Sequence, residues 1–302
     1  MKTVDVVIVS YRSRDVIRRA VEHLAAQPDI SVIVVDNASG DGSLDEVAEL
    51  QVTARQLERN VGFAAGCNEG WRLGSAQYVL FLNPDARIDP ASVRRLALVL
   101  DEGPSVGIAA PLIRDAAGAL EYSQRRFPRL VSTFSQALFL HRLFPRRAWV
   151  DELVRDPTAY AERRSVDWVS GACLLVRREL LERLGGWDER FFMYCEDVDL
   201  CKRVRDLGFA VVFEPATVAM HEGGASAPRP SLLPALATSR LLYAEKHHSG
   251  GRALLERAGI ALNGVTHAVA STQGPGARRG HLRAAARVAV SRRVPTRDRA
   301  VL

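Results

Sequence analysis

The chain has 302 residues, of which 47% are hydrophobic and 25% are charged, the proportions of an ordinary globular protein. No apolar run reaches the ~18 residues of a membrane-spanning helix, and the N-terminus lacks the apolar core of a signal peptide, so we expect a cytoplasmic protein. The four cysteines show no CxxC spacing, which argues against a zinc knuckle or a thioredoxin-type site.

Strand and helix patterns alternate through the first hundred residues. Continuous apolar, β-branched runs predict buried strands at 4–9, 31–36 and 77–82. Helices are expected at 15–26, after Ser43, within 61–73 and at 90–100. This alternation predicts an α/β fold with a mostly parallel central sheet flanked by helices. Ligands of such sheets bind beyond the carboxyl ends of the strands.

The segment 124–149 departs from this alternation, because it mixes large apolar side chains with six arginines. It fits either an amphipathic surface segment or a packed helical excursion with a basic rim, and we favour the packed excursion. Regular structure is expected again from 166 to 221, followed by a proline-containing linker and a helix at about 236–247. We therefore predict a catalytic domain at 1–225 and a helical, Arg-rich extension at 226–302.

The net charge of +6 is concentrated at the C-terminus, where residues 250–302 contain ten arginines against Glu256 and Asp298, a charge of +8. Such a tail suits an anionic surface, either phospholipid or nucleic acid. No aromatic residue lies among these arginines to stack on bases, so we expect a membrane and no nucleic acid. The alternative is a tail that is merely solvated or disordered.

Two polar groups follow buried strands. Asp36 ends the second expected strand, where a carboxylate can accept hydrogen bonds from a ribose or a base. Asn83 and Asp85 follow the third strand and offer the oxygen ligands that magnesium or manganese prefers. Each pattern alone also fits an ordinary turn.

A third cluster places Glu196, Asp197 and Asp199 at the start of an expected helix that ends at Gly208. Acidic residues at a helix N-terminus are stabilised by the helix dipole, but three exceed what capping requires. A carboxylate here could act as the base that a sugar hydroxyl needs for attack. His221 follows a later strand-like run and could bind a metal if it lies beside Asp85.

Five motifs occur in one order along the chain: VIVSY at 7–11, VVDNAS at 34–39, NVGFAAGCN at 60–68, FLNPDA at 81–86 and FMYCEDVDL at 192–200. Together they resemble family 2 of the inverting glycosyltransferases, which has the GT-A fold, over roughly residues 4–225. The chain is most similar to the bacterial rhamnosyltransferase branch, which includes enzymes that act on lipid-linked N-acetylglucosamine.

The resemblance implies a role for each matching residue. Asp197 corresponds to the catalytic base and Glu196 is its neighbour, while Asp85 and His221 correspond to ligands of Mg²⁺ or Mn²⁺. Asn83 occupies the position of the first acid in the family's Asp-x-Asp motif, which weakens the metal site. Asn83 is also expected to line the nucleotide pocket, together with the remaining matches: Ser10, Tyr11, Asp36, Asn60, Gly62 and Asn68.

The resemblance further implies transfer of a sugar, with L-rhamnose from dTDP-rhamnose as the expected donor, to a glycan or polyprenyl-diphosphate-linked acceptor in cell-wall or surface polysaccharide synthesis. The enzyme would then work as a peripheral protein on the inner face of the cell membrane. Alternatives are a UDP- or GDP-sugar donor, a nucleotidyltransferase, or a binding scaffold without catalysis. Ser10-Tyr-Arg-Ser13 does not look like the phosphate loop of a nucleotidyltransferase, and a scaffold has no use for Glu196, Asp197 and His221.

Overall fold

The computed structural model of the chain describes residues 3–144, 147–223, 229–272 and 274–291. The chain divides into two compact units. We call the first the sheet unit (Met1–Arg125, Pro157–Glu189 and Glu196–Ser226) and the second the helical unit (Arg126–Asp156, Arg190–Cys195 and Ala227–Leu302). The segment 126–156, which the sequence placed in the catalytic domain, groups with the C-terminal helices.

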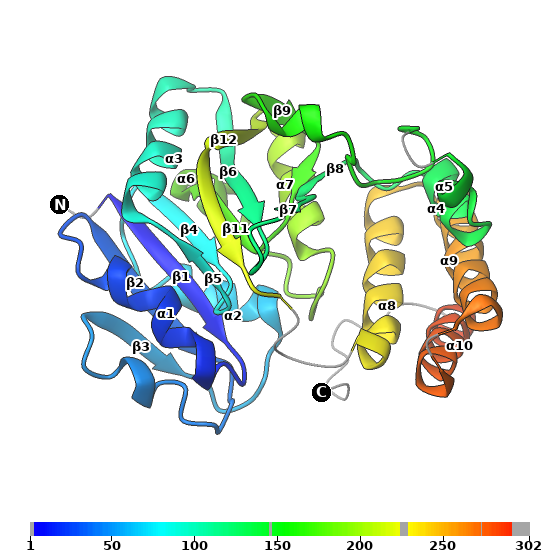
Figure 1. The fold of residues 1–302 in the computed structure, drawn as a ribbon, viewed down its shortest axis with the longest axis horizontal. Helices are drawn as coiled ribbons and strands as arrows, with labels where there is room; N and C mark the ends of the chain where they lie inside the picture. The colour runs from blue at the N-terminus through cyan, green and yellow to red at the C-terminus, as the bar shows by residue number, and fades with distance from the viewer. Residues whose placement is uncertain (1–2, 145–146, 224–228, 273, 292–302) are drawn as a thin grey trace. The chain divides into compact units, whose positions relative to one another are not determined.

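The described part of the sheet unit contains a ten-stranded sheet in the order β3-β2-β1-β4-β11-β6-β12-β5, with β7 beside β6 and β9 beside β12 (Figure 1). The central strands are β1 (Val4–Ser10), β2 (Ile30–Asp36), β3 (Val52–Gln56), β4 (Tyr78–Leu82), β6 (Val106–Arg114), β11 (Cys173–Arg177) and β12 (Ala210–His221). The shorter strands are β5 (Ala86–Ile88), β7 (Leu120–Glu121) and β9 (Arg164–Val166), and β8 (Gln124–Arg125) forms a separate pair with β10 (Trp168–Val169).

Most of the central strands run in one direction. β1 is parallel to β2 and β4, β2 to β3, and β6 to β12. β11 is antiparallel to both β4 and β6, so it reverses the direction between them without changing that of its neighbours. The mostly parallel α/β sheet that the sequence predicted is therefore confirmed, and the carboxyl ends of these strands lie along one edge.

Helices cover both faces of this sheet because alternate residues of each buried strand point to opposite sides. Val4, Val6 and Ile8 of β1 share a core with α1 (Arg14–Ala25) and α3 (Pro90–Glu102). On the other face, β1 meets α2 (Phe63–Trp71) so closely that a Cβ at Gly70 would lie 2.4 Å from Val7. The sheet unit also contains α6 (Arg178–Leu184) and α7 (Glu196–Asp206).

One local expectation was wrong, and one strand was missed. No α-helix follows Ser43: its hydroxyl hydrogen-bonds the Asp41 carboxylate at 2.5 Å, and the chain makes only a 3₁₀ turn at Asp45–Val47 before β3. β3 went unpredicted because it is an edge strand whose residues are mostly exposed, so it carries no apolar pattern. A second 3₁₀ turn spans Pro157–Tyr160.

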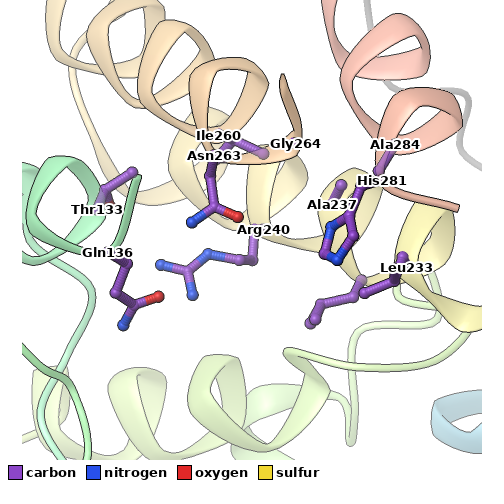
Figure 2. A pocket seen from close by; sticks show the side chains of 11 residues that line it. Thr133, Gln136, Leu233, Ala237, Arg240, Ile260, Asn263, Gly264, His281 and Ala284 are labelled. Atoms are coloured by element: carbon purple, nitrogen blue, oxygen red, sulfur yellow. The ribbon is translucent and has the colours of Figure 1, made fainter. Parts of the chain in front are cut away.

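The helical unit contains α4 (Leu130–Ala137), α5 (Leu140–Leu143), α8 (Arg229–His247), α9 (Gly250–Ala270) and α10 (Pro275–Val290). The expected proline linker was wrong for Pro230 and Pro234, which lie in α8: Pro230 is in the first turn, where its missing N–H has no partner to lose. The rest of the expected linker, at 224–228, lies outside the described residues. The unit encloses a cavity of about 110 Å³. Figure 2 shows Gln136 of α4, Arg240 of α8 and Asn263 of α9 around it. No helix among the described residues is long and apolar enough to cross a bilayer.

One buried ion pair ties the first strand to the rest of the sheet unit. The Asp5 side chain is 2% exposed, and its Oδ2 accepts hydrogen bonds from Arg178 Nη2 at 2.5 Å and from the Ala76 backbone N–H at 2.8 Å. Asp5 interrupts an otherwise apolar strand, and this pairing explains how it is tolerated there. Removing one partner of such a pair leaves the other charge buried without compensation.

We therefore expect Asp5→Ala to lower the free energy of unfolding by about 3 kcal/mol, measured by urea denaturation. Asp29→Ala is the matched control, because Asp29 pairs with Arg94 at 2.8 Å on the surface, where both side chains are about a third or more exposed. The control should lose much less. Equal losses in the two variants would contradict the role assigned to Asp5.

Candidate active site

The ends of β1 and β2 form the first part of the site. The parallel register sets Ser10 opposite Asp36. Both Asp36 oxygens accept hydrogen bonds from Ser39, from its N–H at 3.0 Å and its hydroxyl at 2.5 Å. The Ser10 hydroxyl is buried and has no hydrogen-bond partner among the described residues. Tyr11, partly exposed, follows directly and is covered by the Arg12 guanidinium. This edge therefore presents polar groups and an aromatic ring at the place where doubly wound sheets bind nucleosides.

A hydrogen-bonded bridge brings the N-terminus of α2 to the same edge. The Asn37 side chain donates to the Gly62 carbonyl at 3.1 Å and accepts from the Val61 N–H at 2.8 Å. The Asn60 side chain accepts from the Gly62 N–H at 3.0 Å, and Gly62 has a φ of +89° that a side chain would strain. The unpaired N–H groups of such a helix start favour phosphate groups.

Asn68 lies deeper, on the buried side of α2. Its amide donates to the Trp187 carbonyl at 2.9 Å and to the Glu189 carboxylate at 3.0 Å. Its oxygen accepts from the Trp187 N–H at 2.9 Å and from Trp71 Nε1 at 3.0 Å. The side chain is 1% exposed, so a contact with a nucleotide would have to replace one of these bonds.

The pairing of β5 with β12 builds the candidate metal site. The antiparallel register sets His221 opposite Ala86, immediately after Asp85. His221 Nε2 lies 3.4 Å from Asp85 Oδ1 and 3.3 Å from the Asn83 amide nitrogen. On the other side of the ring, Nδ1 lies 3.0 Å from a Glu121 carboxylate oxygen. His221 thus meets residues that precede it by 100 to 138 positions in the chain.

The electrostatics of this cluster are dominated by its carboxylates. Burial alone would lower the pKa of His221, but the hydrogen bonds and charges of Asp85 and Glu121 outweigh it and raise the pKa to about 9. A metal ion at Nε2 would take the place of that proton. Among the described residues, no three His, Cys, Asp or Glu side chains converge as a complete metal site.

The side chains of Asp85 and His221 fit a divalent cation that needs few protein ligands. Mg²⁺ and Mn²⁺ often take only one or two protein ligands and complete their coordination with phosphate oxygens and water. Asp85 supplies the oxygen, and His221 supplies an imidazole that Mn²⁺ also accepts. Glu121, bonded to the far nitrogen of His221, is placed as the partner that orients a metal-binding histidine.

The candidate base lies at the N-terminus of α7. Asp197 Oδ2 accepts from the Gly171 N–H at 3.0 Å and Oδ1 accepts from the Val198 N–H at 2.8 Å. A Cβ at Gly171 would lie 3.3 Å from the Asp197 Cβ, so a glycine allows this close approach. Burial raises the pKa of Asp197, and the Gly171 N–H and the Arg125 charge oppose that rise in part.

Glu196 is more deeply buried, with 8% of its surface exposed, and its Oε2 has no hydrogen-bond partner among the described residues. Burial and then the charge of Asp197 raise the pKa of Glu196 well above the usual range. Two adjacent acids in this environment resist ionising together, because like charges at close range repel. Asp197, which receives two backbone N–H bonds, is the better placed of the two to hold the negative charge.

The chain enters this helix through a strained turn. Tyr194 and Cys195 have φ angles of +71° and +64°, in the left-handed region that non-glycine residues rarely adopt. The preceding carbonyl, that of Met193, accepts a 2.7 Å hydrogen bond from the Ser239 hydroxyl. Strain of this kind persists where surrounding contacts enforce it, and it is concentrated at functional sites.

The metal side and the base side are linked through β11. The Asn83 backbone N–H donates to the Ala172 carbonyl at 2.9 Å, and the neighbouring Gly171 holds Asp197. Asn83 therefore contacts His221 through its side chain and the base-bearing segment through its backbone. One sheet edge thus carries hydrogen-bond donors, a helix N-terminus and carboxylates. The donors and the helix N-terminus can bind a nucleotide diphosphate, and a carboxylate can remove a proton from an acceptor.

Comparison with known proteins identifies the family. The model of glycosyl transferase family 2 matches residues 5–185. The chain belongs to glycosyl transferase family 2. Its sequence is 33% identical over 242 residues to N-acetylglucosaminyl-diphospho-decaprenol L-rhamnosyltransferase of Mycobacterium tuberculosis, covering 75% of this chain and 78% of that one. It is 28% identical to the rhamnosyltransferase WbbL of Escherichia coli, covering 72% and 82%.

Solved glycosyltransferases share the fold. A mannosyltransferase from Pyrobaculum calidifontis, solved with GDP-Man and Mn²⁺, aligns with a TM-score of 0.56 at 17% identity, covering 95% of this chain and 84% of that one. GalNAc-T7, solved with UDP, GalNAc and Mn²⁺, aligns with a TM-score of 0.57 at 15% identity, covering 82% and 50%. The predicted GT-A fold and glycosyltransferase activity are thus confirmed, while the individual site residues stay predictions.

The structure adds residues to this glycosyltransferase site that sequence reasoning missed. Glu121, which bonds His221, comes from a two-residue strand without any motif. Arg125, whose charge acts on Asp197, was noted only as one of several arginines. Gly171 lies outside the five motifs that marked the family. Asn37 lies inside the motif at 34–39, but only its neighbour Asp36 was assigned a role.

The proximity of Arg125 predicts a pH effect. If Asp197 is the base, kcat/KM must fall as the pH drops through its raised pKa, above the ~4 of an ordinary aspartate. Arg125→Gln removes the positive charge that opposes the rise, so the acid limb of the profile should move to higher pH. Arg94→Gln, on the surface, is the control. A limb that does not move, or moves to lower pH, would rule out this coupling.

Proposed function

We propose that this protein is an inverting rhamnosyltransferase that moves L-rhamnose from dTDP-rhamnose to a lipid-linked N-acetylglucosamine acceptor. The observation that carries the proposal is the match of 242 residues to the mycobacterial enzyme whose name states this activity. That match extends well beyond the motifs common to the family. The second rhamnosyltransferase, from Escherichia coli, supports the same donor sugar.

The reaction we propose is a single displacement. The Asp197 carboxylate takes the proton of the acceptor hydroxyl, and the acceptor oxygen bonds to the anomeric carbon from the face opposite the nucleotide. The bond from that carbon to the diphosphate oxygen breaks, and dTDP leaves with the electron pair. The two N–H groups on Asp197 keep its carboxylate in one orientation for this proton transfer.

At the diphosphate end, Asp85 and His221 would hold a divalent cation, which when bound neutralises charge on the departing diphosphate. Glu121 would orient the His221 ring through Nδ1. The N-terminus of α2, fixed by Asn37 and Asn60, would contribute backbone N–H groups to the phosphates. Ser10, Tyr11 and Asp36 would receive the nucleoside.

The acceptor determines where the enzyme must work. A polyprenyl-diphosphate-linked sugar stays at the bilayer surface, so we propose peripheral attachment to the inner face of the membrane, supported by the basic C-terminal extension. The part of that extension described by the structure forms α8, α9 and α10, and residues 292–302 lie outside the described residues.

A donor panel tests the proposal. dTDP-rhamnose, UDP-sugars and GDP-sugars are each offered with N-acetylglucosaminyl-diphospho-polyprenol, and the products are identified by mass spectrometry. We expect turnover with dTDP-rhamnose. Turnover with a UDP- or GDP-sugar alone would replace the proposed donor.

Asp197→Asn should bind the donor normally and lose about 10²–10⁴-fold in kcat, because the side chain keeps its shape but loses its basicity. Asp206→Asn on the same helix is the control: its side chain is 55% exposed and pairs with Lys202, so its kcat should be unchanged. Normal turnover by Asp197→Asn would exclude Asp197 as the base.

Asp85→Ala and His221→Ala should each weaken binding of Mn²⁺ together with dTDP, measured by calorimetry, and Asp85→Ala should have the larger effect because it removes the only carboxylate of the pair. Arg87→Ala, in the adjacent strand and 45% exposed, is the control. If EDTA leaves wild-type turnover intact, the assignment of both residues as metal ligands fails.

A further inference from the structure

Two helices of the helical unit, α4 and α10, bury mainly small side chains, while many large apolar side chains of the unit are exposed. The buried residues of α4 are Ser132, Thr133, Ser135 and Ala137. Those of α10 are Ala277, Gly280, Ala284, Ala285 and Val288. In an ordinary water-soluble bundle the large apolar side chains lie between the helices.

The helix contacts depend on small residues. A Cβ at Gly259 of α9 would lie 2.8 Å from Thr133 of α4. A Cβ at Gly264 would lie 2.8 Å from Ala285 of α10, and one at Gly280 would lie 2.4 Å from the Pro230 carbonyl of α8. Close approach of helices at small residues is typical of helices packed within a membrane.

The interior of the unit also holds charged and polar side chains. Glu256 of α9 is 2% exposed and accepts a 2.7 Å hydrogen bond from Thr133. Arg240 of α8 pairs with the buried Glu152 at 2.5 Å. The cavity in Figure 2 is lined by the polar side chains of Gln136, Arg240 and Asn263 as well as by apolar ones such as Leu233 and Ile260.

The outer surface of the helical unit exposes many large apolar side chains. Among the described residues, twelve of the fifteen large hydrophobic side chains that are exposed belong to the helical unit. On α9, Leu254, Leu255, Val265 and Val269 are 65%, 51%, 46% and 78% exposed. The spacing of positions 254, 258, 261, 265 and 269 forms one stripe along the helix, and Ala258 and Ala261 fill it without a charge.

A second apolar group adjoins this stripe. The Thr266 hydroxyl donates to the Ala137 carbonyl at 2.7 Å, and the rings of His267 and Phe139 lie 4.4 Å apart, so the end of α4 packs on the last turns of α9. The exposed large apolar side chains of the segment that follows Ala137 are Leu138, Leu143, Phe144 and Trp149, at 53%, 72%, 46% and 42%. We call the α9 stripe and this group together the outer apolar face.

Charge identifies what this face would contact. The residues of the helical unit include 20 Lys and Arg against six Asp and Glu, a net charge of +14, which leaves −8 for the sheet unit. Arg278, Arg279 and Arg283 of α10 are exposed. A unit that exposes both apolar side chains and arginines matches the acyl chains and the anionic headgroups of a bilayer. A nucleic acid would satisfy the arginines but not the apolar face.

We infer that the helical unit binds an anionic phospholipid bilayer by immersing its outer apolar face at the headgroup boundary, with its arginines among the headgroups. The unit lies on the bilayer and does not cross it, since no described helix meets the length and apolarity for spanning. This inference rests on the proposed function for its purpose, because the acceptor is held at that surface. It also separates this attachment from the C-terminal residues 292–302.

Vesicle co-sedimentation of the full chain tests the inference. The vesicles contain equal amounts of phosphatidylglycerol and phosphatidylcholine. Leu254→Glu and Val269→Glu should each weaken binding about tenfold or more, because each puts a charge where an apolar side chain enters the bilayer. Leu98→Glu on α3, 49% exposed in the sheet unit, is the matched control and should bind like wild type. Circular dichroism confirms that each variant folds.

Trp149 offers a direct signal. It is 42% exposed, while Trp71, Trp168 and Trp187 are at most 8% exposed. Adding the vesicles should shift tryptophan emission to the blue, and Trp149→Phe should abolish the shift. An unchanged emission spectrum in protein that has sedimented with the vesicles would overturn the inference.

Other outcomes also overturn it. Undiminished binding by both α9 variants, with loss of binding on deletion of 292–302, would assign attachment to the tail. A change from dimer to monomer in the α9 variants, without loss of vesicle binding, would make the face a contact between two copies of the chain. Rhamnosyl transfer to a short soluble acceptor is measured in parallel: it should be unchanged in these variants, and its absence from wild type would count against the proposed function alone.

Discussion

The site depends on one constraint, the common direction of the central strands. β1, β2, β4 and β12 end at the same edge of the sheet, so side chains from distant parts of the chain meet there. Strand direction alone does not bring His221 to Asp85. The register of the antiparallel pair of β5 and β12 does so. A slip of one residue in that pair would turn the imidazole to the opposite face of the sheet.

The acidic pair at the start of α7 shows how the fold balances charge against burial. Two adjacent carboxyl groups in a desolvated place cost free energy when ionised. The structure lowers that cost for Asp197 with two backbone N–H groups, the helix N-terminus and the charge of Arg125, but gives Glu196 Oε2 no partner among the described residues. The two neighbouring carboxyl groups are therefore electrostatically distinct.

The two units solve different physical problems. The sheet unit buries large aliphatic side chains on both faces of a sheet, as at Val6, Ile8 and Val34, and carries a net negative charge. In the helical unit, α4 and α10 pack mainly through small residues, and the unit carries a large positive charge. Packing through small residues gives little hydrophobic stabilisation in water, so the hydrogen bonds of Glu256 and Arg240 have a larger share in holding this unit together.

The sequence by itself determined the α/β class, most of the strands and helices of the first hundred residues, and the candidate residues Asp85, Asp197 and His221. It could do so because apolar periodicity and motif spacing are local properties, and because continuous apolar runs such as Val4–Ser10 have few alternatives to a buried strand. The same reasoning missed β3, whose exposed edge position leaves no pattern, and it took the prolines of α8 for a linker.

Tertiary structure alone decided which of the candidate site residues lie together and which further residues lie beside them. Nothing local in Glu121 or Arg125 shows that one will face His221 and the other Asp197, since both partners lie far along the chain. It also decided that Asn68 uses its whole amide within the protein, and that the leucines and valines of α9 face outward. An amphipathic pattern states which residues share a side of a helix, but only the neighbours that the fold brings to that helix determine which side is covered.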